Sequence, residues 1–173
     1  GQAISLSITT TTLAMLLTLL FGTPLAYLLA RRRFRGHAWL DTLLDLPMVL
    51  PPSVAGIALL IAFGRRGLLG QYLSVAGIEL AFTSSAVVLA QLFVAAPFYI
   101  KAAAAGFAGI DRELEQAAAL DGASRGQVFR YVTAPLSWVA LLGGAVMTWA
   151  RALGEFGATI IFAGNFAGRT QTM

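Results

Sequence analysis

Residues Ile4–Ala30 read ISLSITTTTLAMLLTLLFGTPLAYLLA, a run of 27 positions without a charged side chain. A helix needs roughly 20 apolar residues to cross the hydrocarbon core of a bilayer. The rest of the chain agrees, because 58% of its residues are hydrophobic, only 12% are charged, and its mean hydropathy is +0.77. Soluble domains usually carry about 25% charged residues. The sequence therefore predicts an integral membrane protein built from helices.

Three further apolar segments follow, and we expect four membrane crossings in all. The second is Leu46–Phe63, which contains three prolines; the third is Leu80–Ile100, and the fourth runs from Ala134 to Phe162. Proline at membrane depth frees backbone carbonyls, which is tolerated only where protein or water can satisfy them. We therefore expect the second crossing to be buried or to line a cavity. Residues 1–173 are interpreted as one all-α, polytopic membrane domain.

Basic residues are distributed unevenly between the two sides that these crossings define. The loop after the first crossing holds four arginines, and Lys101–Arg130 holds four more basic residues, against three on the opposite side. Cytoplasmic loops of membrane proteins carry an excess of Lys and Arg. We therefore place both basic-rich segments in the cytoplasm. The cluster Arg31–Arg35 is interpreted as an interfacial anchor, with contact to an anionic lipid or a partner protein as the alternative.

Residues Lys101–Arg130 form a charged island between the third and fourth crossings. Asp111 can cap a short helix that Gly122 ends. Ser124 followed three residues later by Gln127 has the spacing of a capping box for a second short helix. Four acidic residues balance four basic ones here, whereas a lipid-binding loop would be mostly basic. We expect a compact helical knob that fits a groove on a partner protein.

Three motifs in this sequence resemble the permease subunits of ABC importers. Glu115–Gly122 (EQAAALDG) is similar to the EAA loop of that family, with Gln116 standing where the family pattern has Glu. Leu46–Pro52 (LPMVLPP) and Arg151–Asn165 (RALGEFGATIIFAGN) look like the molybdate branch, as does the ending Gly168–Met173. The similarity covers nearly the whole chain. It implies a transmembrane helical bundle of the type I importer kind.

The resemblance also implies a role and a set of partners. The chain would be a homodimeric, multi-pass subunit of an ATP-driven oxyanion importer in a bacterial inner membrane, surrounded by membrane lipid. An extracytoplasmic binding protein would deliver the anion, and the motifs shared with the molybdate branch imply that this anion is molybdate. Cytoplasmic ATP-binding cassette subunits would bind ATP and Mg. At least one C-terminal crossing is expected to be missing. Tungstate, sulfate or thiosulfate are alternative substrates, and a non-catalytic membrane scaffold is a more remote alternative.

The candidate coupling site lies in the cytoplasmic loop 101–133, where the knob would dock onto the ATPase. A second candidate site belongs to the translocation path or a gate, because ions within a membrane are usually functional. Arg151 and Glu155 are four residues apart on one predicted helical face, although Arg151 alone reaching the far interface is the alternative reading. The coupling residues are Glu115, Gln116, Ala117, Ala118, Asp121 and Gly122, and the path residues are Arg151, Glu155 and Asn165.

The sequence gives no support for catalysis by this chain. A P-loop ends in Lys-Ser or Lys-Thr after a glycine, but the only lysine, Lys101, follows Ile100. A single histidine and no cysteine leave no His-His zinc motif and no thiolate metal site. We therefore expect no catalytic residue, no metal site, no cofactor and no nucleic-acid partner, with ATP hydrolysis on a separate subunit.

Overall fold

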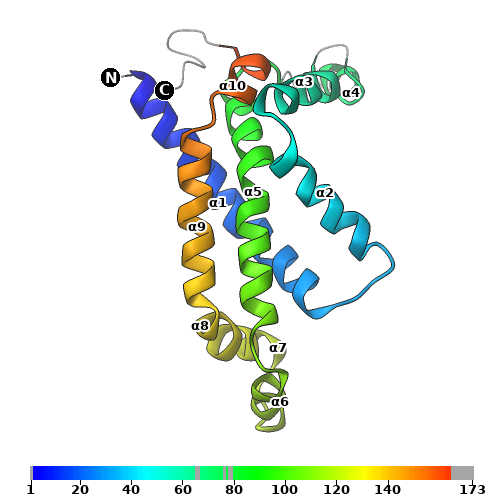
Figure 1. Cartoon of the computed structure of the whole chain (residues 1–173), viewed down its shortest axis with the longest axis vertical. Helices are drawn as coiled ribbons and strands as arrows, with labels where there is room; N and C mark the ends of the chain where they lie inside the picture. Colours follow the sequence, from blue (N-terminus) through cyan, green and yellow to red (C-terminus); the bar gives the residue numbers. More distant parts are fainter. Residues whose placement is uncertain (1, 65–66, 76, 78–79, 165–173) are drawn as a thin grey trace.

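The computed structural model describes residues 2–64, 67–75, 77 and 80–164, and every regular element in this part of the chain is a helix. This confirms the predicted all-α class. Figure 1 shows α1, α5 and α9 running along the molecule, with α3, α4 and α10 at one end and α6 and α7 at the other. The elements are α1 (Gln2–Arg31), α2 (His37–Val49), α3 (Pro52–Phe63), α4 (Gly70–Val75), α5 (Ser84–Ala108), α6 (Arg112–Leu120), α7 (Arg125–Val128), the π-helix η1 (Phe129–Thr133), α8 (Ala134–Leu136), α9 (Trp138–Leu153) and α10 (Gly157–Phe162).

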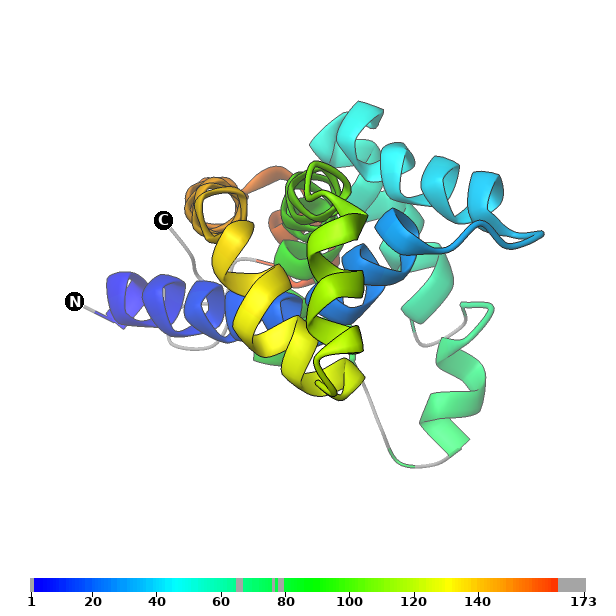
Figure 2. The ribbon, with the colours of Figure 1, turned by 90° about the horizontal axis from the view of Figure 1, so that it is seen from below.

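Helix α5 forms the centre of the bundle and packs against both α1 and α9 (Figures 1 and 2). Thr83 begins this helix by accepting a hydrogen bond from the backbone N–H of Ala86. Small residues bring α5 and α9 close together, since a Cβ atom on Gly144 would lie 2.9 Å from the Cβ of Ala102. Such small residues at helix contacts are typical of membrane bundles, where close packing replaces hydrophobic burial from water.

Two helices, α1 and α5, are long and apolar enough to cross a membrane as single spans. They correspond to the first and third predicted crossings. A further candidate is bent, because the segment from α7 to α8 meets α9 at an angle of 72°. Together with the apolar α3, these helices make the chain a multi-pass membrane protein.

The second predicted crossing, Leu46–Phe63, is two helices rather than one. Helix α2 ends at Val49 and α3 begins at Pro52, while Leu50 has extended backbone angles. The cause is local, because the ring of a proline disfavours the helical conformation for the residue before it. Helix α3 then has 12 residues, too few to cross a bilayer alone.

The fourth predicted crossing is interrupted as well. Helix α9 ends at Leu153 and α10 begins at Gly157. Helix α10 then packs against α3, where a Cβ atom on Gly56 would lie 2.9 Å from the backbone of Ala158. The apolar stretch 134–162 is therefore divided among α8, α9 and α10, and the last of these packs against α3.

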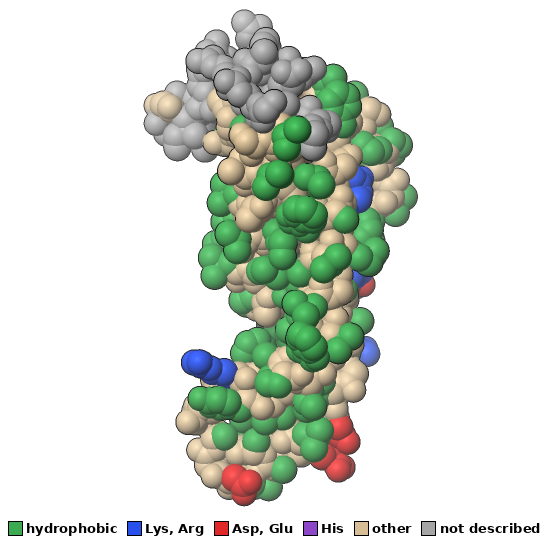
Figure 3. Space-filling view, turned by 90° about the vertical axis from the view of Figure 1, so that its left-hand side faces the viewer, with side chains coloured by type: hydrophobic (Ala, Val, Ile, Leu, Met, Phe, Trp, Pro, Cys, Tyr) green, Lys and Arg blue, Asp and Glu red, His purple; other side chains and the backbone are tan. Residues whose placement is uncertain are grey.

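The surface separates an apolar middle from a charged end (Figure 3). Hydrophobic side chains cover the visible face, and acidic side chains gather at the end formed by α6 and α7. Much of the apolar cover belongs to α9, whose exposed side chains include Trp138, Val139, Leu142, Val146 and Met147. A helix that exposes this much apolar surface is suited to lipid or to another membrane helix.

Candidate functional site

Helices α6 and α7 form the knob that the charged island predicts, at the lower end of the bundle in Figure 1. An Asp111 carboxylate oxygen accepts the backbone N–H of Glu113 at 3.0 Å and begins α6. Gly122 has φ of +92° just after that helix, a conformation that glycine adopts without strain. Ser124 and Gln127 exchange both hydrogen bonds of a capping box at the start of α7. The predicted local structure of the knob is confirmed.

Most of the predicted coupling residues lie on the surface of the knob. Gln116, Ala117, Asp121 and Gly122 are exposed, and Ala118 is half-buried. Leu120, which the sequence analysis did not single out, is 88% exposed at the end of α6. An apolar side chain that projects from a short helix outside the bundle can act as the anchor when such a helix docks into a groove on another protein.

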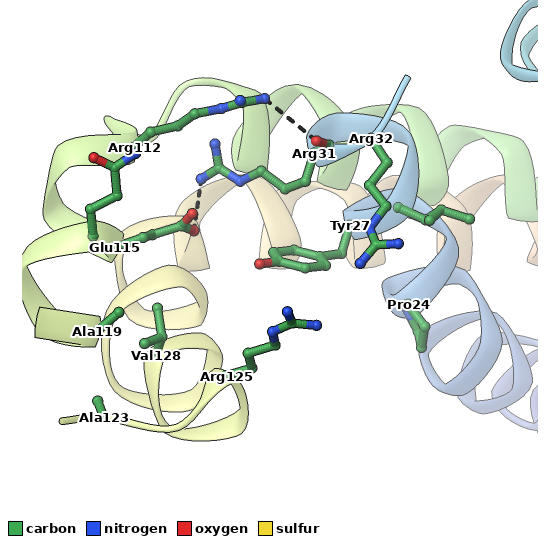
Figure 4. A pocket seen from close by; sticks show the side chains of 12 residues that line it. Pro24, Tyr27, Arg31, Arg32, Arg112, Glu115, Ala119, Ala123, Arg125 and Val128 are labelled. Carbon is green, nitrogen blue, oxygen red and sulfur yellow. Dashed lines mark hydrogen bonds and ion pairs between the residues drawn. The ribbon is translucent and has the colours of Figure 1, made fainter. Parts of the chain in front are cut away.

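Glu115 differs from the other coupling residues, because its carboxylate is used inside the chain. Its Oε1 accepts a hydrogen bond from Nη2 of Arg31 at 2.8 Å (Figure 4). The same oxygen accepts another from the hydroxyl of Thr133 at 2.6 Å. The side chains of Arg31 and Glu115 are only 10% and 15% exposed. These three residues, which we call the knob clip, connect the end of α1, the knob and η1.

The knob clip depends on the π-helix. Thr133 is fully buried at the end of η1, and its hydroxyl lies 3.5 Å from the backbone oxygen of Val128, five residues earlier. Phe129, at the start of η1, makes edge-to-face contact with Tyr27 at 5.4 Å and lies 6.0 Å from the ring of Phe107. An aromatic cluster from α1, α5 and η1 therefore supports the knob from within the bundle.

A second Arg–Glu pair lies at the other end of α9. Nη1 of Arg151 donates to Oε2 of Glu155 at 2.8 Å, while Oε1 of Glu155 accepts the backbone N–H of Ala158 at 2.7 Å. The two side chains are 32% and 1% exposed. The predicted pairing is present, but the prediction that both residues share one helical face is wrong, since α9 ends at Leu153. Glu155 instead places its charge at the N-terminus of α10, where the helix dipole favours an anion.

The third residue of the predicted path, Asn165, lies outside the described residues. Sequence reasoning also missed Gln91, which is 1% exposed within α5. Its Nε2 donates to the hydroxyl of Thr11 at 3.1 Å and to the backbone oxygen of Ala152 at 3.2 Å. Its Oε1 has no hydrogen-bond partner among the described residues. Gln91 thus connects α1, α5 and the last turn of α9, and the lone amide in an apolar run was its only signal.

A third ion pair joins α2 to α5 on the outside of the bundle. Nζ of Lys101 lies 2.6 Å from Asp41 and 2.9 Å from Asp45. The lysine side chain is 29% exposed, and the two carboxylates are about half exposed. The two contacts of Lys101 hold α2 beside α5 without burying any of the three charged groups.

Comparison with known proteins places these features in a wider group. A family model described as "Binding-protein-dependent transport system inner membrane component" matches residues 22–172. The matched stretch includes the knob and both Arg–Glu pairs. The first 20 residues of α1, from Gln2 to Phe21, precede it.

Individual relatives agree with the family match. The molybdenum transport system permease protein ModB of Mycobacterium bovis is 49% identical over 173 residues, covering 99% of this chain and 65% of that protein. The Escherichia coli K12 protein of the same name is 44% identical and is covered to 76%. A molybdate/tungstate transport system permease protein of Thermococcus kodakarensis is 42% identical over 162 residues and is covered to 60%. The chain thus spans less than two thirds of the mycobacterial and archaeal relatives.

Proposed function

The chain belongs to the family of binding-protein-dependent transport system inner membrane components, and from this we propose that it is the membrane-spanning permease subunit of an ATP-driven oxyanion importer. Molybdate is the proposed substrate, because the mycobacterial and E. coli relatives are named molybdenum transport permeases. The observation that carries the proposal is the knob, a capped pair of helices outside the bundle that is fixed to α1 through buried charges.

The knob supplies the contact with the ATPase. Its surface combines two exposed leucines of α6, Leu114 and the more exposed Leu120, with polar groups that include Gln116 and Asp121. An apolar anchor within a polar rim is how short helices dock into grooves on other proteins. ATP and Mg would be bound by the partner. This chain would take no part in ATP hydrolysis, and the conformational change of the partner would displace the knob.

The knob clip then carries that movement into the membrane. Because Glu115 holds both Arg31 and Thr133, displacement of α6 pulls on the end of α1 and on the segment that leads into α9. Nucleotide binding can drive such a change only if the ATPase binds one arrangement of the knobs better than the other. Two copies of the chain would be needed to enclose a path, and the apolar face of α9 is the surface offered to the second copy or to lipid.

Arg151 is the proposed contact for the passing anion. Glu155 accepts hydrogen bonds from Arg151 and from the start of α10, and as an anion and acceptor it cannot itself hold an oxyanion. The guanidinium of Arg151 has five N–H donors, and its side chain is one-third exposed. A divalent tetrahedral anion is a good acceptor for the donors that Glu155 leaves free.

The first experiment measures ATP hydrolysis by the full-length permease, reconstituted with its ATPase and binding protein, while molybdate, tungstate and sulfate are titrated separately. Stimulation at low molybdate and none by sulfate supports the proposal. Stimulation by sulfate alone retains the importer and discards the substrate. No stimulation by any anion favours the membrane scaffold.

The contact with the ATPase has its own test. Leu120→Ser should weaken binding of the ATPase by about tenfold or more, because anchor residues in docked helices contribute more than 1 kcal/mol each. Phe34→Ser is the matched control, since Phe34 is exposed on the same side of the membrane but lies outside the knob. Equal weakening by both variants would argue against docking through the knob.

Tungstate is the second candidate substrate. The Thermococcus relative is named for both molybdate and tungstate, and the two oxyanions have the same charge and shape. The titration above separates them by the anion concentration that gives half-maximal stimulation.

A further inference from the structure

A pocket of about 580 Å³ lies between the last two turns of α1 and the knob (Figure 4). Its wall is apolar at Pro24 and Leu28 of α1, and it becomes cationic toward the end of α1 and on the knob. One acidic residue, Glu115, also lines it, which leaves an excess of three positive charges. The basic residues in the lining are Arg31, Arg32, Arg112 and Arg125.

Two of these arginines have no counter-ion within the part of the chain that the structure describes. Arg32, from the end of α1, and Arg125, from the start of α7, extend their guanidinium groups into the same opening (Figure 4). Neither side chain makes an ion pair or a hydrogen bond with a described residue. Unpaired positive charges that face one another repel, so the opening favours an anion between them.

Arg31 provides a second and independent observation. Its side chain is nine-tenths buried and holds Glu115 through Nη2, yet its Nε has no hydrogen-bond partner among the described residues. Buried donors in folded proteins almost always find an acceptor, because leaving one unpaired costs free energy. The wall of the pocket therefore holds a further cation, Arg31, whose hydrogen bonds are incompletely satisfied, in addition to the two uncompensated charges.

The position of the pocket along α1 narrows the choice of ligand. Pro24 and Arg31 are about 10 Å apart along the helix at 1.5 Å per residue, and the uncharged run of α1 ends at Ala30. The pocket thus extends from the hydrocarbon edge into the layer where lipid headgroups lie. A free anion would use only the cationic part of this space, whereas a phospholipid also uses the apolar wall.

We infer that this pocket seats the headgroup of an anionic phospholipid, with its phosphate between Arg32 and Arg125 and its acyl region along Pro24 and Leu28. Guanidinium groups bind phosphate oxygens through paired hydrogen bonds, and basic pockets at the cytoplasmic ends of membrane helices hold such headgroups. The bound lipid would bridge α1 and the knob beside the knob clip. This inference is independent of which anion the protein transports.

Native mass spectrometry on the full-length permease tests the inference, both alone and in complex with its ATPase. The protein is equilibrated with equal amounts of phosphatidylglycerol and phosphatidylcholine that carry the same acyl chains. The expected result is selective retention of phosphatidylglycerol. Arg32→Gln combined with Arg125→Gln should reduce that selectivity by roughly thirtyfold, since each basic residue near an anionic headgroup contributes about a factor of five.

Matched variants separate the pocket from general surface charge. Arg33→Gln combined with Arg130→Gln removes two exposed arginines outside the pocket lining and should leave the selectivity unchanged. Arg32→Lys combined with Arg125→Lys keeps the charge and should retain most of it. Equal loss in the two glutamine pairs, or no selectivity in the unaltered protein, overturns the inference.

Competition experiments distinguish the lipid from other occupants. Inorganic phosphate and molybdate at millimolar concentration should not displace phosphatidylglycerol, because neither contacts the apolar wall. Displacement by either anion would assign the pocket to a free oxyanion. Stoichiometric release of the lipid when the ATPase binds would assign it to the protein partner. Either result overturns the lipid assignment while leaving the proposed transport function standing.

Discussion

The two Arg–Glu pairs among the described residues have the same N–O distance of 2.8 Å but connect very different lengths of chain. Arg31 and Glu115 are 84 residues apart and join α1 to the knob. Arg151 and Glu155 are four residues apart and span the break between α9 and α10. The same chemistry therefore acts as a link between elements at one end and as a local start signal for a helix at the other.

The second hydrogen bond that each carboxylate accepts explains why the pairs are not interchangeable. Glu155 also accepts a backbone N–H, that of Ala158, which can only donate. Glu115 also accepts from the hydroxyl of Thr133, a group that can donate or accept. A carboxylate is thus required at position 155, whereas position 115 requires only a partner of opposite charge.

The largest loss of stability is expected when the Arg151–Glu155 pair at the start of α10 is removed. Glu155→Ala should lower the free energy of unfolding by about 3–5 kcal/mol, because it removes a carboxylate that is only 1% exposed and leaves both Arg151 and the backbone N–H of Ala158 without their acceptor. Exchange of the charges, Arg151→Glu with Glu155→Arg, should not restore stability, since the N–H of Ala158 would then face a cation. Unfolding in detergent mixtures measures both, and recovery in the exchanged protein would refute the requirement for a carboxylate.

A somewhat smaller effect is expected at the knob. Glu115→Ala should cost about 2–3 kcal/mol, less than at position 155 because this carboxylate is 15% rather than 1% exposed and the hydroxyl of Thr133 keeps the backbone oxygen of Val128 as an acceptor. Here the exchange Arg31→Glu with Glu115→Arg should recover most of the loss. Hydrogen exchange of α6 amides is the readout, and faster exchange should accompany Glu115→Ala alone. An exchange that fails here as fully as at α10 would remove the distinction between the pairs.

The contact between α5 and α9 tests whether packing matters as much as the ion pairs, because α9 runs between the two Arg–Glu pairs. Gly144→Ala should destabilise by about 1–2 kcal/mol, since the new Cβ would meet Ala102 and Tyr99. Gly143→Ala is the matched control, because a Cβ there meets nothing within 4 Å and alanine favours the helix. Thermal unfolding should lower the midpoint for Gly144→Ala and leave it unchanged or raised for the control; similar losses would contradict this packing.

The smallest effect is expected at the exposed pair on α2 and α5. Asp41→Asn should change stability by about 0.5 kcal/mol or less, since water screens these charges and Asp45 still faces Lys101. Addition of salt should reduce even this difference. A loss as large as that at Glu115 would mean that exposure does not set the strength of these pairs.

The sequence predicted those contacts whose two partners lie only a few residues apart in the chain. The caps at Asp111 and at Ser124 depend on residues two or three positions away, and both are present. The Arg151–Glu155 pair was expected from its spacing, although the end of α9 between them was not. Gly154 was an available signal for that end, because glycine commonly follows the last turn of a helix.

The features that the sequence did not predict depend on the fold as a whole. Nothing near Glu115 indicates that Arg31 will lie beside it, because their meeting requires α1 and α5 to pack along their length. The same holds for Gln91, whose partners come from two other helices. The break in Leu46–Phe63 is different, since its prolines were noted but were expected to bend one helix rather than separate two.

The π-helix Phe129–Thr133 has a consequence for how the chain tolerates changes in length. Each residue of an α-helix turns the chain by about 100°, and a π-turn contains one residue more than an α-turn. Deleting a single residue from this turn would close it to an α-turn. Thr133, whose hydroxyl now lies against the oxygen of Val128 five residues earlier and donates to Glu115, would lose that position. Homologous chains should therefore keep the length of this segment fixed, even where its side chains vary.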